Sequence, residues 1–170
     1  MADAEWFLTT ERLLVRGFTL DDLDEFHAYR NDPAVARWQG WDVPYSRESA
    51  EALVYEMAIS ELFRPGEWTQ LALERKDTVR LIGDIGVRRE PVEPTAEVGI
   101  TLAADAQGIG YATEALDAVV EDLFRTLALA RVIAIVHQEN ASVRRLLDRT
   151  GFAVVAQDGD ELIFSRRAAH

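Results

Sequence analysis

The segment most suited to chemistry is Gln-Gly-Ile-Gly-Tyr-Ala-Thr-Glu, which occupies residues 107–114. Small residues at 108, 110 and 112 allow backbone amides to approach a ligand closely. An amphipathic pattern over residues 111–127 predicts a helix directly after the glycines. The unpaired N–H groups and positive dipole at the start of that helix are suited to binding a phosphate. The alternative interpretation is a tight turn eased by glycine, with no ligand.

Two common nucleotide-binding motifs do not match this segment. A Walker-A loop requires Gly-Lys-Ser/Thr, and no lysine is nearby, so ATP or GTP hydrolysis is not expected. A dinucleotide fingerprint would begin at Gly108 and Gly110, but its third glycine position is occupied by Thr113. The residues alone therefore leave two interpretations open: a phosphate site of another kind, or a tight turn without a ligand.

Helices and strands alternate in a pattern that predicts an α/β layer architecture with helices on both faces of a mixed sheet. Strands are expected at residues 8–16, 68–74, 81–88, 97–102, 132–136, 152–156 and 162–164. Helices are expected from Thr19 to residue 30, from Pro44 and Ser46 up to the breaker at 64–66, from Gly110 to residue 127, and from Asn140 or Ser142 to residue 150. The unbroken apolar run at 132–136 predicts a strand covered on both faces.

The composition is that of one globular domain, and we expect that domain to span residues 1–170. Hydrophobic residues make up 48% of the 170 residues, enough for a substantial core. The absence of cysteine excludes disulfides, thiolate metal sites and a cysteine nucleophile, and it suits a cytoplasmic location. The longest uncharged stretches have eight residues, whereas a membrane helix needs about 20 apolar ones, so we expect no membrane association.

The net charge of −12 argues against nucleic-acid binding, which requires a basic surface. Thirteen acidic residues stand against five arginines in residues 1–63. Such an excess favours a cationic partner, although acidic residues also simply keep a surface soluble.

Several motifs together resemble the GNAT superfamily of acyl-CoA-dependent N-acyltransferases. Gln107, Gly110 and Ala112 match the family's Gln/Arg-x-x-Gly-x-Gly/Ala loop, and Asn140 with Gly-Phe at 151–152 resembles its later motif. Thr-Glu-Arg-Leu-x-x-Arg at 10–16 is similar to the opening strand of the branch that acetylates N-termini of ribosomal proteins. The resemblance implies a single N-acetyltransferase domain. Its mostly antiparallel twisted sheet would have about seven strands, a central splayed parallel pair and helices on both faces.

The same resemblance implies acetyl-CoA as cosubstrate, no metal, and a set of cofactor contacts. Loop amides would bind the CoA pyrophosphate, with Gln107 shaping the turn; the residues are Gly108, Ile109, Gly110, Tyr111, Ala112 and Thr113. The pantetheine arm would lie between residues 97–102 and 132–137. A backbone N–H near Ile100 or Thr101 would stabilise the oxyanion. Asn140 would contact the arm, or serve only as a helix cap.

For catalysis, the resemblance places the general base at Glu97, which is otherwise an ordinary solvent-facing strand acid. His137 is a candidate proton relay or a hydrogen-bonded core residue. The sequence departs from the family at the general acid: the Tyr position is Leu147 and the Ser position is Val143. Ser142 is therefore our candidate acid, unless it only caps a helix; Tyr111 is the weaker alternative.

The acceptor is expected to be a cationic amine. The two early helices wall the acceptor site in the family, and acidic and aromatic residues there would form an acidic mouth: Asp21, Asp22, Asp24, Glu25, Asp32, Asp42, Trp38 and Trp41. The α-amine of a peptide or protein is one acceptor class, and a polyamine or aminoglycoside is the alternative. A CoA-binding sensor without catalysis is a third possibility, and a homodimer is compatible with exposed tryptophan and a free sheet edge.

Overall fold

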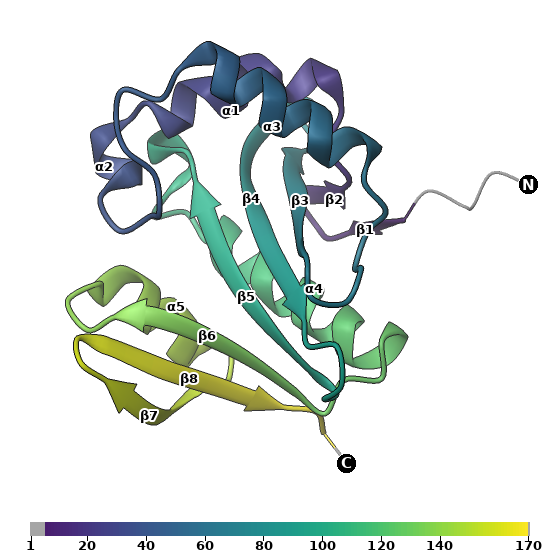
Figure 1. Cartoon of the computed structure of the whole chain (residues 1–170), viewed down its shortest axis with the longest axis vertical. Helices are drawn as coiled ribbons and strands as arrows, with labels where there is room; N and C mark the ends of the chain where they lie inside the picture. Colours follow the sequence, from purple (N-terminus) through teal and green to yellow (C-terminus); the bar gives the residue numbers. More distant parts are fainter. Residues whose placement is uncertain (1–5, 170) are drawn as a thin grey trace, which may run out of the picture.

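The structure, a computed structural model, describes residues 6–169, which form one eight-stranded sheet with helices on both faces (Figure 1). The strands are β1 (Phe7–Thr9), β2 (Leu13–Arg16), β3 (Trp68–Arg75), β4 (Arg80–Arg89), β5 (Thr95–Leu102), β6 (Arg131–His137), β7 (Ala153–Asp158) and β8 (Glu161–Arg167). The α-helices are α1 (Leu23–Arg30), α2 (Pro33–Ala36), α3 (Arg47–Ile59), α4 (Tyr111–Thr126) and α5 (Ala141–Arg149). Short 3₁₀ turns η1 (Leu20–Asp22) and η2 (Ala104–Ala106) precede α1 and the glycine-rich segment.

The strand order is β1-β2-β3-β4-β5-β6-β8-β7, and β5–β6 is the one parallel pair within residues 6–169. Its register runs from Thr95 opposite Arg131 to Glu97 opposite Ile133, and pairing stops there. Beyond that point the two strands diverge, as Figure 1 shows. A cavity lined by side chains of both strands occupies this opening between β5 and β6. The expected central splayed pair is thus confirmed.

Two hydrophobic cores cover the two faces of the sheet. The larger core packs α4 and α5 against the strands, with Leu116, Val119 and Leu123 of α4 almost fully buried. The smaller core lies under α1 and α3, around Phe26 and Val54. The layered α/β architecture predicted from the sequence is confirmed.

The sheet has eight strands rather than about seven, because residues 8–16 do not form one strand. A turn breaks them into β1 and β2, which pair with each other; Thr10 N–H donates to Leu13 O at 2.9 Å. The prediction that β6 is covered on both faces is also wrong, since only Val132 and Ala134 are buried and Ile135 is 39% exposed. That exposed face borders the opening between β5 and β6.

Two helix boundaries differ from expectation. Pro33, expected only to follow the end of α1, also begins the short helix α2. Asp32 caps this helix, since its Oδ1 accepts a hydrogen bond from Ala34 N–H at 2.9 Å. Ser46 caps α3 as predicted, but α3 ends at Ile59, before the expected breaker. None of the helices between residues 6 and 169 is both long enough and apolar enough to cross a bilayer.

Candidate active site

The glycine-rich loop, residues 107–113, follows β5 and η2 and includes the first residues of α4. Gly108 and Gly110 have φ angles of +78° and +89°, which glycine adopts without strain. Gln107 Nε2 donates to Leu102 O at 3.0 Å and so closes the turn from inside. Gly110 is the N-cap of α4 and provides no side chain to bond the first-turn amides. Those N–H groups therefore remain donors for an anion.

A cavity of about 580 Å³, the outer cavity, opens beside this loop. Its wall combines the loop with the end of β5, the segment around α2, and α5. The lining includes Gln107, Gly108, Gly110, Tyr111, Ala112, Thr113, Ile100, Thr101, Asn140, Ser142, Arg145 and Arg149. Ile109, whose side chain is exposed, does not line it. The outer cavity thus combines unpaired amides with three arginines, Arg37, Arg145 and Arg149, a set of donors that suits an anionic ligand.

A second cavity of about 420 Å³, the inner cavity, lies in the opening between β5 and β6. Its lining mixes apolar and polar side chains and includes Val98, Gly99, Ile100, Leu116, Ala134, Ile135, Val136, His137, Val143, Leu147 and Glu161. Arg37, Trp38, Gln39, Ile100, Asn140 and Val143 line both cavities. The two cavities are therefore neighbouring parts of one groove that runs from the loop into the sheet.

The backbone of Ile100 stands where the two cavities meet. Gln39 Nε2 donates to Ile100 O at 3.4 Å, so this carbonyl faces the groove rather than β4. The N–H and C=O of one strand residue point to the same side. The Ile100 N–H therefore faces the groove as well, beyond the point where β6 diverges from β5.

His137 ends β6 and lines the inner cavity. Its Nδ1 accepts from Glu139 N–H at 3.2 Å, which in the neutral ring places the proton on Nε2. In that tautomer the free side of the ring is a hydrogen-bond donor rather than a base.

Glu97 lies on β5 but does not line either cavity. Its Oε2 accepts from Arg88 Nη2 at 3.0 Å, and its side chain is 16% exposed. The expected base thus lies on β5, the strand that lines the groove, and its carboxylate is paired with Arg88. Its role as a base remains a prediction.

The two candidate caps of α5 are distinguished by the structure. Asn140 Oδ1 accepts from Val143 N–H at 3.3 Å, so Asn140 is the cap, while Ser142 faces the outer cavity. Val143 and Leu147, at the family's Ser and Tyr positions, line the inner cavity with apolar side chains.

The expected acidic mouth is absent from the lining of either cavity. None of the six expected carboxylates lines the groove, although Trp38 does. Asp22 is buried and paired with Arg16 at 2.8 Å, and Asp24 pairs with Arg47. Trp41 belongs to the fold: its Nε1 donates to Arg30 O at 2.9 Å and its ring lies 4.0 Å from the Arg30 guanidinium. Asp22 and Asp24 therefore take part in ion pairs around α1 instead.

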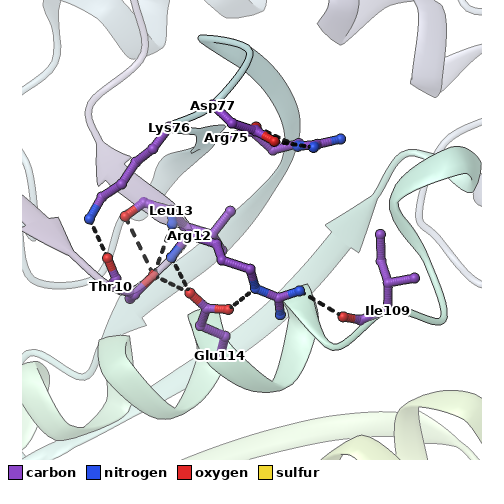
Figure 2. A network of polar contacts seen from close by, with 8 residues as sticks. All are labelled: Thr10, Arg12, Leu13, Arg75, Lys76, Asp77, Ile109 and Glu114. Atoms are coloured by element: carbon purple, nitrogen blue, oxygen red, sulfur yellow. Dashed lines mark hydrogen bonds and ion pairs between the residues drawn. The ribbon is translucent and has the colours of Figure 1, made fainter.

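Sequence reasoning missed two features of the site. Glu161, at the start of β8, is the one carboxylate among the described residues that line the groove. Arg12 contacts the glycine-rich loop from behind through Ile109 and Glu114, as Figure 2 shows. Arg12 is the third residue of the Thr-Glu-Arg motif, but no local pattern connects it to Ile109 or Glu114, about one hundred positions away.

Comparisons with known proteins agree with this geometry. Residues 12–153 match the family model described as an acetyltransferase (GNAT) domain. The uncharacterized N-acetyltransferase YoaA of Bacillus subtilis is 31% identical over 85% of this chain and 81% of its own length.

Two solved structures share the fold. The ribosomal-protein-S5-alanine acetyltransferase of Vibrio fischeri superposes with a TM-score of 0.81 at 18% identity, over 96% of this chain and 97% of that one. The microcin C7 self-immunity acetyltransferase MccE, solved with acetyl-CoA and AMP, gives 0.81 at 14% identity over 94% of both chains. These structures show the shared fold, while the family model and the curated relative show the family. The chain is a member of the GNAT family of acetyltransferases, which transfer the acetyl group of acetyl-CoA to an amine.

Proposed function

We propose that this N-acetyltransferase acts on the α-amine of a peptide or protein N-terminus. The observation that carries the proposal is the continuous groove, which connects the amides of the glycine-rich loop to the opening between β5 and β6. One end suits a phosphate, and the other is a recess between the two strands, reached past Trp38.

The residues of the groove fit acetyl-CoA. The first-turn amides of α4 lack a side-chain cap, and the Cβ that an added side chain would place at Gly108 has no heavy atom within 4 Å. Arg145 and Arg149 add positive charge to the same cavity, as a pyrophosphate requires. When bound, acetyl-CoA supplies an acyl group activated as a thioester. The amides of residues 108–113, with Asn140 and the Ile100 backbone, would hold it.

The chain's own residues then have two tasks. The Ile100 N–H faces the groove and would donate to developing negative charge on an oxygen there. A base must remove the proton of the acceptor amine, and Glu97 is the proposed base, acting directly or through water. An α-amine titrates near 7.7–8.0, so about a tenth is already neutral at pH 7, whereas a lysine side chain near 10.4 needs more help. Ser142 is the proposed donor to the departing sulfur; a thiol of pKa near 8.5 leaves with little assistance.

The charge of the groove favours a peptide α-amine over a polycation. A polyamine or aminoglycoside would be attracted by several carboxylates. The described lining instead has Glu161 as its single carboxylate and Arg37 at the junction of the two cavities. One carboxylate is enough for a single ammonium group and offers nothing to a second or third.

The test is release of CoA thiol from acetyl-CoA with a panel of acceptors. The panel comprises short peptides beginning with Ala or Ser, the same peptides with blocked N-termini, spermidine and an aminoglycoside. We expect turnover with free N-termini and none with blocked ones, even where a lysine is present. Faster turnover with spermidine or the aminoglycoside than with any peptide would overturn the proposed acceptor.

A further inference from the structure

We infer that Arg12, held in place by Glu114, is a positioning residue that aims the amides of the glycine-rich loop at the outer cavity. The inference rests on the proposed binding of the CoA pyrophosphate by that loop. Arg12 does not line the outer cavity, so it acts through the loop rather than on the ligand.

Arg12 contacts the loop at three consecutive residues. Its Nη1 donates to Ile109 O at 3.0 Å, and its guanidinium lies 4.3 Å from the centre of the Tyr111 ring. Its Nη2 is 3.2 Å from the position that a Cβ on Gly110 would occupy. The guanidinium therefore packs against the back of the loop, as Figure 2 shows for the Ile109 bond.

Glu114, in the first turn of α4, fixes Arg12. Its Oε2 accepts from Arg12 Nε at 2.7 Å, and its Oε1 accepts from the Arg12 N–H at 2.7 Å and from Thr10 Oγ1 at 2.6 Å (Figure 2). Partial burial alone would raise the pKa of the Glu114 carboxyl. The hydrogen bonds from Thr10 and Arg12 outweigh burial and hold that pKa below its usual value. The carboxylate thus stays ionised and keeps Arg12 oriented.

The geometry of the peptide bond turns this contact into an effect on the ligand side. Ile109 C=O and Gly110 N–H belong to the same planar trans peptide, so they point in opposite directions. Arg12 holds the carbonyl on the side of β2. The Gly110 N–H is thereby turned away from Arg12, and Gly110 lines the outer cavity. If Arg12 were lost, this peptide would be free to rotate and present its carbonyl oxygen to an anion.

A merely structural role for Arg12 would be to anchor α4 to β2, and the choice of acyl donor separates the two roles. S-Acetylpantetheine carries the same thioester as acetyl-CoA but lacks the pyrophosphate and nucleotide. A change confined to the pyrophosphate site should weaken acetyl-CoA alone, whereas a displaced helix should affect both donors.

The experiment measures KM and kcat for both donors in the wild type, Arg12→Gln, Arg12→Lys and Glu114→Gln. For Arg12→Gln we expect KM for acetyl-CoA to rise about tenfold, the scale of one charge-assisted hydrogen bond, with kcat little changed. The kcat/KM for S-acetylpantetheine should equal that of the wild type. Glu114→Gln should also raise KM for acetyl-CoA. In the Arg12→Gln/Glu114→Gln double variant, the rise in KM should be smaller than the product of the two single rises.

Arg166→Gln is the matched control, because Arg166 also pairs with α4, at Asp117 (2.8 Å) and Glu121, farther along the helix. It should lower thermal stability without changing KM for acetyl-CoA. An unchanged KM for acetyl-CoA in both Arg12→Gln and Arg12→Lys would overturn the inference alone, as would equal losses with both donors. A wild type that does not use acetyl-CoA would overturn the proposed function together with the inference.

Discussion

The indole of Trp38 stacks on the imidazole of His137, with ring centroids 5.1 Å apart and planes inclined by 27°. This contact joins the segment after α2 to the end of β6 across the groove. Because Trp38 lines both cavities, the stacked rings lie at the point of the groove where the two cavities meet.

Replacing Trp38 by Ala should impair substrate binding much more than folding. The side chain is only half-buried and belongs to neither hydrophobic core. We expect KM to rise about tenfold for the acceptor, the scale of a lost aromatic contact and its buried area, with a shift of the unfolding midpoint of only a few degrees. Initial-rate kinetics and thermal unfolding check this. Trp41→Ala is the control. Since Trp41 packs on Arg30, this variant should lower the unfolding midpoint strongly and leave the KM for the acceptor little changed. A large loss of stability in Trp38→Ala would contradict this assignment.

Removing the carboxylate of Glu97 should slow turnover in a pH-dependent way. At pH 6.5 the amine is mostly protonated and needs a base, whereas at pH 9 most of it is already neutral. Glu97→Gln should therefore lose much more activity at pH 6.5 than at pH 9. Glu90→Gln is the matched control, since Glu90 is the other carboxylate near Arg88, at 3.7 Å, and it should leave both rates unchanged. Equal losses at the two pH values would argue against Glu97 as the base.

Asn140 should contribute to both stability and cofactor binding, and two substitutions separate these contributions. Asn140→Ala removes the cap of α5 and should cost about 1 kcal/mol of unfolding free energy. Asn140→Asp is an equally good cap, so it should keep that stability while its negative charge weakens acetyl-CoA binding. Ser142→Ala should not affect stability. Urea unfolding with calorimetric titration tests all three; a stability loss in Ser142→Ala equal to that of Asn140→Ala would show that the cap is wrongly assigned.

The buried pair of Tyr29 and Asp84 predicts a pH dependence of stability. Tyr29 OH donates to Asp84 Oδ2 between β4 and α1. Burial raises the pKa of the Asp84 carboxyl above its ordinary value, and burial and the neighbouring Asp84 raise the pKa of the Tyr29 phenol.

A raised pKa for an acid means that the folded state binds the proton more tightly than the unfolded state does. The contribution of Asp84 to stability is therefore full below the unfolded value of about 3.9 and is lost as pH rises through the raised folded value. Asp84→Asn keeps an acceptor for Tyr29 but cannot ionise. Its unfolding free energy, relative to the wild type, should increase from pH 4 to pH 7. Urea unfolding across that range checks the sign, and a constant difference would contradict it.

Local patterns predicted most of the fold. Apolar spacing located α4, Ser46 and Gly110 marked helix starts that the structure confirms, and the turn after β3 marked its hairpin. The break between β1 and β2 was missed because Leu8 and the apolar residues at 13–15 suggest a single strand; only pairing of the chain with itself reveals the turn. The exposed face of β6 was missed for a similar reason, since an apolar run does not say that its neighbouring strand diverges.

The site was predictable where chemistry is local and failed where it depends on distant residues. The glycine-rich loop could be identified because its glycines and the following helix are adjacent in sequence. The early acids could not be placed, because whether Asp22 faces a substrate or Arg16 depends on tertiary contacts. Arg12 reaches the loop from the turn before β2, and Glu161 reaches the groove from the start of β8, so neither contact follows from a local sequence pattern.

The central claim is that the glycine-rich loop holds the pyrophosphate of acetyl-CoA through its backbone amides, and Gly108 offers the most direct test. Its φ of +78° is tolerated by both Asn and Asp, and a Cβ there meets no heavy atom within 4 Å. Gly108→Asn and Gly108→Asp therefore differ mainly by one negative charge beside the proposed phosphate.

Calorimetric titration with acetyl-CoA of the wild type and both variants, with ATP and NAD as control ligands, makes this measurement. The account predicts selective micromolar binding by the wild type, binding within a few-fold of it for Gly108→Asn, and a loss of tenfold or more for Gly108→Asp, about 1.4 kcal/mol. Absence of acetyl-CoA binding in the wild type, or equal affinities in the two variants, would contradict it.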